Sequence, residues 1–137
     1  MNRVYVHLVW GTWDRLPLLT PARRREAYAA MKSKCDELGC EVFAIGGIED
    51  HVHLVVQLSA TVGFATLAKE VKGCSSHLLT HGSDDGFFKW QGAYAAFSVE
   101  QENLPALVEY VRNQEAHHRD QSHKPEHEIS FEEPDAP

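Results

Sequence analysis

Two histidines lie one residue apart in a stretch that otherwise has the composition of a buried strand. The segment IEDHVHLVVQL, residues 48–58, places His51 and His53 among valine and leucine side chains. Because side chains alternate across a strand, both imidazoles are expected on one face, at a spacing that lets both reach one cation. His7, on an earlier predicted strand, is expected to point the same way. The HxH pattern is weak alone, and two structural histidines are its simpler explanation.

A second polar pair follows near the C-terminus. Tyr110 and Gln114 are four residues apart in YVRNQEAHHRD, so they share one side of a predicted helix, on the flank of its apolar stripe. Taken singly, they would be a half-buried ring and a solvated amide. Together with the two histidines they supply a nucleophile, an oxygen ligand and two nitrogen ligands.

The chain has the composition of a single globular domain. Its 137 residues are 43% hydrophobic and 24% charged, which is enough for one core. No apolar run reaches membrane-spanning length, and the start of the chain lacks the layout of a secretory signal. Cys35, Cys40 and Cys74 show no CxxC spacing, so we expect reduced thiols in a cytoplasmic protein.

The net charge of −7 is concentrated near the C-terminus. Residues 120–137 hold six acidic residues and one lysine, a net of −5, whereas residues 1–119 hold 14 acidic and 12 basic residues, a net of −2. We therefore predict a functional domain over 1–119 and an acidic, flexible tail over 120–137. The nearly neutral body does not exclude DNA as a partner.

The predicted elements alternate in a regular order. Strands are predicted over 3–10, 40–47, 51–58 and 93–99, helices over 20–39, 61–80 and 103–119, and a loop over 81–86. Thr20 is the expected N-cap of the first helix, Pro21 its first residue and Gly39 its end. This order predicts an α+β fold of ferredoxin-like split βαβ type, with an added C-terminal helix that carries the tyrosine. Its antiparallel sheet would have the first and third strands at its centre.

The apolar positions predict which faces are buried. The third strand should pack on the helices through Val52, Leu54, Val56 and Leu58, and the second helix through Phe64, Leu67, Val71 and Leu78. The last helix carries its apolar stripe on Leu104, Leu107, Val108 and Val111.

The combination of DHVHLVV with YVRNQEAHHR, about 60 residues later, resembles the single-tyrosine HUH transposases. These enzymes serve small insertion sequences and repetitive palindromic (REP) elements. The segments HLVWGTWDRLPLL, VKGCSSHLL and WQGAYAAFSV also look like that family, so the resemblance spans residues 3 to about 133. It would make 1–119 an HUH transposase domain.

The resemblance implies a metal-dependent DNA strand transferase. The family's ligands for Mg²⁺ or Mn²⁺ match His51, His53 and Gln114, and its nucleophile matches Tyr110. Attack on phosphorus would give a 5′-phosphotyrosine and a free 3′-hydroxyl, and a second 3′-hydroxyl would reverse the step without ATP. The implied substrate is single-stranded DNA marked by a hairpin. The implied working species is a homodimer, in which Tyr110 completes its own site or that of the other subunit.

The predicted DNA contacts are Lys69, Lys72, Lys89 and Arg112, and Trp90 is a candidate for stacking on bases. Ordinary solvated charges and a core tryptophan explain these residues equally well. Two other classes of function remain open. One is a non-catalytic ferredoxin-like module that binds nucleic acid. The other is a metal-dependent phosphoesterase that uses water and has no need of Tyr110.

Overall fold

A four-stranded antiparallel sheet forms the centre of the computed structural model, which describes residues 3–81, 86–114 and 116. Its strands are β1 (Tyr5–Gly11), β2 (Glu41–Ile48), β3 (His51–Gln57) and β4 (Ala95–Val99). They lie in the order β2-β3-β1-β4, and every neighbouring pair is antiparallel. The predicted ferredoxin-like topology, with the first and third strands at the centre, is confirmed.

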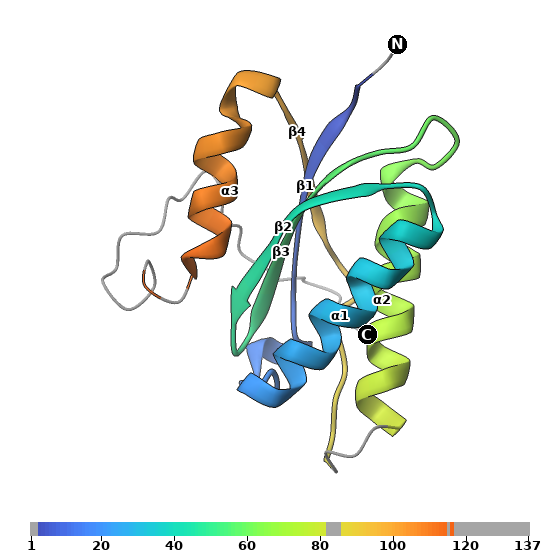
Figure 1. Ribbon diagram of the computed structural model, residues 1–137. Helices are drawn as coiled ribbons and strands as arrows, with labels where there is room; N and C mark the ends of the chain where they lie inside the picture. The colour runs from blue at the N-terminus through green and yellow to red at the C-terminus, as the bar shows by residue number, and fades with distance from the viewer. Residues whose placement is uncertain (1–2, 82–85, 115, 117–137) are drawn as a thin grey trace.

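Helices cover both faces of this sheet. Figure 1 shows α1 (Pro21–Glu37) and α2 (Phe64–His81) on one side and α3 (Leu104–Arg112) on the other. The start of α1 is as predicted, because the Thr20 hydroxyl accepts a hydrogen bond from the Arg23 amide at 3.2 Å and Pro21 is the first helical residue. Just after α1, Gly39 has φ +78°, a conformation that glycine adopts without strain.

Each face of the sheet has its own apolar core. Val52, Leu54 and Val56 of β3 belong to the large core under α1 and α2. Val55 belongs to a smaller core under α3, which also contains Leu107 and Val111. The predicted alternation of β3 is therefore confirmed, and its histidines lie on the α3 side.

The buried stripe of α2 differs from the predicted one. Its buried residues are Leu67, Ala68, Val71, Ser75 and Leu79. The prediction was wrong for Phe64, which is 45% exposed, and Leu78 is only partly buried. Trp90 explains part of the shift, because its indole is buried and donates a hydrogen bond to the Ser75 hydroxyl at 3.0 Å. Trp90 is therefore a core residue and is not exposed for stacking on DNA bases.

The last helix is shorter than predicted in its regular part. A 3-10 turn at Gln101–Asn103 leads into α3, which ends at Arg112. Asn113 leaves the helical region with φ −106° and ψ 28°, and Gln114 is helical again. The rest of the predicted helix 103–119 lies outside the described residues, apart from residue 116. So do the tail 120–137 and most of the loop 81–86.

The backbone of α3 lies directly on β2 at Gly46. A Cβ atom built on Gly46 would stand 2.0 Å from the carbonyl oxygen of Val111. No other residue type fits at this position without moving the helix. This contact fixes the height of α3 above the sheet, one residue from Tyr110. No helix in the described part of the chain is long and apolar enough to cross a membrane.

Candidate active site

The two histidines of β3 and the two polar residues of the C-terminal helical segment meet on one face of the sheet. His51 and His53 are fully buried, and Tyr110 and Gln114 are 3% and 1% exposed. The Nε2 atom of His51 lies 3.2 Å from the Oε1 atom of Gln114. The ring of Tyr110 stands edge-on to that of His53, with 6.0 Å between ring centroids. The structure thus brings together all four residues that the sequence singled out.

His51 is oriented by its neighbour in the chain, Asp50. The Nδ1 atom of His51 lies 2.8 Å from a carboxylate oxygen of Asp50, which also pairs with Arg15 at 3.4 Å. Burial raises the pKa of the Asp50 carboxyl, but the hydrogen bond with His51 and the charge of Arg15 outweigh it, so the net pKa is lowered. An ionised carboxylate only accepts hydrogen bonds. Nδ1 of His51 therefore carries the proton, and in the neutral ring Nε2 presents its lone pair.

The amide of Gln114 also presents a lone pair at this point. Its Nε2 atom donates to the backbone oxygen of Tyr110 at 3.4 Å, which turns Oε1 toward His51. Two acceptor atoms, one nitrogen and one oxygen, therefore face each other in a buried site. Two ligands on adjacent positions of a cation with bonds of about 2.1 Å stand about 3 Å apart. The residues present fit a divalent cation.

His53 is held by the histidine of the neighbouring strand. Nε2 of His7 lies 2.8 Å from Nδ1 of His53, and the two rings stack with 5.1 Å between their centroids. His7 is 1% exposed. The expectation that His7 shares the face of the HxH pair is confirmed. Hydrogen bonds of this kind orient the ring of a metal-binding histidine and fix which nitrogen is available to the metal.

Asp50 is the member of the site that sequence reasoning missed. Its position immediately before the HxH pair was visible in the sequence, but a residue in a two-residue turn after β2 has no predictable direction. Among the described residues, no group of three His, Cys, Asp or Glu side chains is arranged to hold a metal ion. A cation site here would therefore depend on the amide of Gln114.

The four predicted DNA contacts do not gather around this site. Lys69 is exposed and Lys72 half-buried on α2, across the sheet from α3. The Nζ atom of Lys72 donates to the carbonyl oxygens of Gln91 at 2.7 Å and Gly92 at 3.2 Å, which ties down the segment before β4.

The other two predicted contacts also have partners within the chain. The Lys89 ammonium lies over the ring of Trp13, 3.9 Å from its centroid. Arg112 is exposed at the end of α3, and its guanidinium donates to the backbone oxygen of Phe43 at 3.4 Å. Of the four, Arg112 is the one carried by the tyrosine helix.

Comparison with known proteins identifies the family. The family described as "Transposase IS200 like" matches residues 1–114. No curated protein matches the chain in sequence. A protein of Deinococcus radiodurans R1, described as a candidate transposase, has a similar structure, with a TM-score of 0.65 and 18% identity over 91% of this chain and 95% of its own.

A second solved structure is a REP-associated tyrosine transposase bound to a REP hairpin. It has a TM-score of 0.67 and 13% identity, covering 90% of this chain and 72% of its own. At these identities the structural likeness shows the shared fold. The family match covers most of the chain, and its end coincides with Gln114 of the site. This protein therefore belongs to the IS200-like transposase family.

Proposed function

We propose that this transposase cleaves and rejoins single-stranded DNA through a covalent bond to Tyr110. The observation that carries the proposal is the meeting of Tyr110 and Gln114 with the HxH pair in one buried cluster. A binding module needs no such cluster, and an enzyme that activates water needs no tyrosine beside it. The family to which the chain belongs supports DNA cleavage and rejoining as the reaction class.

A divalent cation, Mg²⁺ or Mn²⁺, is part of this proposal, with His51, His53 and Gln114 as its ligands. The distance of 3.2 Å between Nε2 of His51 and Oε1 of Gln114 supports it, because two ligands on adjacent positions of one cation have about this spacing. When bound, the ion would polarise the scissile phosphate and offset the charge that develops on it. Asp50 and His7 keep the two imidazoles in the orientation that this role requires.

In the first step the oxygen of Tyr110 forms a bond to phosphorus, and the bond between phosphorus and the 3′-oxygen breaks. The phenol proton is lost, and the leaving 3′-oxygen takes up a proton to become a hydroxyl. Attack by a second 3′-hydroxyl restores the phenol and joins the strands. Because Tyr110 is only 3% exposed, its ring or α3 must move before the DNA can reach its oxygen.

The substrate in this proposal is a DNA strand marked by a hairpin, and the working species is a homodimer. The similar REP-associated transposase bound to a REP hairpin supports the hairpin. Lys69, Lys72, Lys89 and Arg112 are the proposed backbone contacts. Since Lys72 and Lys89 already have partners in the chain, and Arg112 has only a long bond of 3.4 Å to the Phe43 carbonyl oxygen, we expect Lys69 and Arg112 to contribute most to affinity.

The deciding experiment compares wild type with Tyr110→Phe on labelled single-stranded DNA from the flanks of its own gene, with Mg²⁺ or Mn²⁺. The Phe variant keeps the ring and its packing but lacks the attacking oxygen. We expect binding to survive and the covalent adduct, scored on a denaturing gel, to vanish. Tyr28→Phe on α1 removes a hydroxyl from the opposite side of the sheet and is the matched control, which should form the adduct as wild type does.

The two rival functions give different results in the same assay. A phosphoesterase that uses water would cleave equally well with Phe at position 110, and no adduct would form with wild type. A binding module would cleave with neither protein. Undiminished cleavage by Tyr110→Phe would therefore end the mechanism proposed for this transposase.

A further inference from the structure

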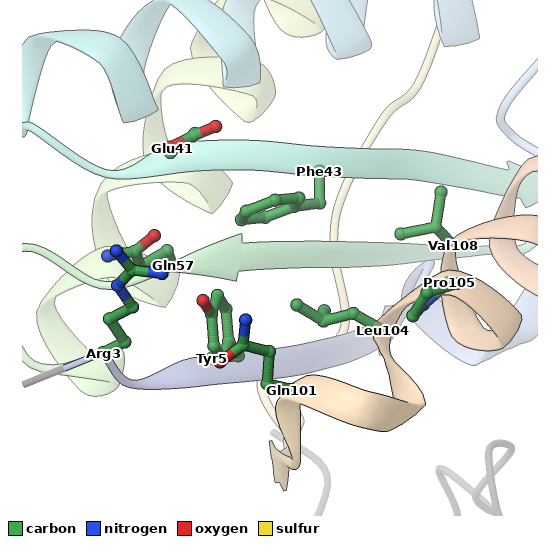
Figure 2. A pocket seen from close by; sticks show the side chains of 9 residues that line it. All are labelled: Arg3, Tyr5, Glu41, Phe43, Gln57, Gln101, Leu104, Pro105 and Val108. Carbon is green, nitrogen blue, oxygen red and sulfur yellow. The ribbon is translucent and has the colours of Figure 1, made fainter.

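A cavity of about 690 Å³ lies on the α3 side of the sheet, away from the histidines. We call it the far-end pocket; it is lined by Arg3, Tyr5, Glu41, Phe43, Gln57, Gln101, Leu104, Pro105 and Val108. Its size is that of an ordinary small-molecule site. Figure 2 shows the rings of Tyr5 and Phe43 between the apolar side chains of α3 on one side and Arg3 and Gln57 on the other, with Gln101 beside Tyr5.

The chemistry of the far-end pocket matches a flat ring with polar edges. Tyr5 and Phe43 form an edge-to-face pair with 5.7 Å between centroids. Tyr5 is 6% exposed and Phe43 half-buried, so part of the Phe43 ring is open to a ligand. Leu104 and Val108 supply an apolar wall opposite. Because Tyr5 and Leu104 belong to one packed core, with Phe43 and Val108 against it, a planar ring would stack on the open part of Phe43 at the mouth of the pocket.

The rim of the far-end pocket supplies hydrogen bonds without net charge. Gln57 and Gln101 each carry a primary amide, with both donors and an acceptor, and neither amide is bonded to another described residue. Arg3 and Glu41, both exposed, add one positive and one negative charge. Such a rim does not favour a phosphate, which needs net positive charge. It does fit the edge of a nucleobase, because amides and guanidinium groups read base edges.

The far-end pocket also lies within reach of the proposed site of cleavage. Gln57 ends β3 and His51 begins it, on the same face of the sheet. Six residues of strand separate them, which is about 20 Å. An extended DNA strand whose scissile phosphate lies at Tyr110 can therefore place a base a few nucleotides away in the pocket.

We propose that the far-end pocket binds one unpaired nucleobase of the DNA strand that the transposase cleaves. The base stacks on Phe43, and the amides of Gln57 and Gln101 bond to its edge. This inference rests on the proposed function for its choice of ligand. Its geometry does not involve any residue of the proposed metal site. The pocket would help to fix which phosphate of the strand reaches Tyr110.

The first test uses the four phosphate-free 2′-deoxynucleosides as probes and the ¹⁵N-labelled full chain observed by NMR. Binding should shift the side-chain amide signals of Gln57 and Gln101 and the backbone signals around Phe43. Phe43→Ala should weaken the best nucleoside by about tenfold or more, the scale of one base stack. Phe64→Ala, which removes an exposed ring from α2 on the other face, is the matched control and should change nothing.

Gln57→Ala is a second variant, in case Phe43→Ala does not fold. It should fold normally, because Gln57 is a half-exposed residue at the end of a strand. It should weaken binding and alter the preference among the four bases. Absence of shifts at the pocket with all four nucleosides would overturn the proposal. So would shifts there that appear on concentrating the protein alone, since they would assign the pocket to a second copy of the chain.

A second test links the far-end pocket to the DNA strand. Abasic positions are introduced one at a time into the strand used for the adduct assay, and binding is measured with Tyr110→Phe. An abasic site at one position of the strand should weaken binding by about tenfold. The same abasic site should have no effect when the protein also carries Gln57→Ala or Phe43→Ala. Equal loss in both backgrounds at every position would overturn the proposal. If wild type formed no adduct but these binding results held, the proposed function would be wrong. The proposal that the far-end pocket binds a nucleobase would still stand.

Discussion

At the scale of single residues, the two histidines of the site differ in what orients them. His51 bonds to an ionised carboxylate and His53 to another imidazole. His7 is the hydrogen-bond partner of His53. Its role can be tested with one substitution that keeps the hydrogen bond to His53 and one that removes it. His7 is buried on β1, and no direct contact between it and the DNA or the cation is needed for this role. It is a positioning residue.

We predict that His7→Leu weakens binding of Mn²⁺ by about 10–100-fold, the usual effect of losing a hydrogen bond to a ligand. His7→Gln should restore most of it, because the glutamine amide reaches the place of Nε2 and can accept from His53. Isothermal titration with Mn²⁺ measures both, and circular dichroism checks that both variants fold. A Leu variant with the metal affinity of wild type would show that His7 only fills space.

We predict that Tyr28 on α1 makes the free energy of unfolding depend on pH in the alkaline range. Its hydroxyl is buried without a hydrogen-bond partner among the described residues, and burial raises its pKa to about 12, against the opposing charge of Arg24. A tyrosine in the unfolded chain titrates near 10. Because the folded state disfavours the phenolate, the stability linked to this group is fully present below about pH 10 and is lost as the pH rises toward about 12.

Tyr28→Phe removes that loss. We expect its urea unfolding at neutral pH to match wild type or to gain up to about 1 kcal/mol, since a buried hydroxyl without a partner is costly. Between pH 10 and 12, the Phe variant should keep stability that wild type loses. Parallel alkaline melts of the two proteins measure the difference. Coincident curves over that range would contradict the burial of this phenol.

At the scale of elements, the position of α3 depends on a single glycine. Gly46→Ala would place a methyl group 2.0 Å from the carbonyl oxygen of Val111, so α3 must rise from β2. We predict a loss of about 1–3 kcal/mol in stability, the cost of overpacking. Formation of the DNA adduct should fall more steeply, because Tyr110 and Gln114 move with the helix.

Gly73→Ala provides the matched control for this prediction. Gly73 lies inside α2, and a Cβ atom there meets nothing within 4 Å. The same substitution should therefore stabilise the protein by about 0.5–1 kcal/mol through helix propensity and leave the adduct unchanged. Thermal unfolding and the adduct gel distinguish the two variants. Equal behaviour of both would show that close packing at Gly46 does not position the tyrosine.

The sequence was most informative where local physics decides the structure. Alternation placed His51 and His53 opposite Val52 and Leu54, and Thr20 with Pro21 marked the start of α1, as observed. These features depend on a residue and its immediate neighbours. They were enough to predict the topology and the face on which the site forms.

Long-range contacts were what the sequence could not supply. The buried stripe of α2 includes Ser75 because Trp90, 15 residues later, bonds to it. Arg23, one of three consecutive arginines in the sequence, is 5% exposed because its guanidinium donates to the carbonyl oxygens of Leu18 and Gly86. Neither partner is implied by periodicity within a helix. The direction of Asp50 depends in the same way on Arg15, far away in the chain.

At the scale of the whole molecule, the two cores have separate tasks. The large core joins α1 and α2 to one face of the sheet and contains none of the site residues. The smaller core holds α3 to the other face and includes Tyr110 itself. Helix α3 is therefore attached through fewer apolar residues than the rest of the fold. This arrangement suits the movement that the proposed mechanism requires, because in it DNA must reach a buried tyrosine.

The same arrangement bears on how two chains would share the work in the proposed homodimer. Gln114 reaches His51 of its own chain at 3.2 Å, and Tyr110 contacts His53 of its own chain. Gly46 and Val111 hold the helix on the same chain's β2. Each chain thus carries a complete set of site residues. We predict that each site uses its own tyrosine, whatever the number of chains in the assembly.

Mixing two inactive variants tests this prediction. Tyr110→Phe lacks the nucleophile, and His53→Ala lacks a proposed metal ligand, so neither forms the adduct alone. If each site uses its own tyrosine, no mixed dimer contains a complete site, and co-refolded variants should remain inactive. If the tyrosine acted in the other subunit's site, the mixture would regain activity, with DNA attached to the His53→Ala chain. A size tag on that chain identifies it on the gel, and light scattering of the mixture establishes that the two chains have associated.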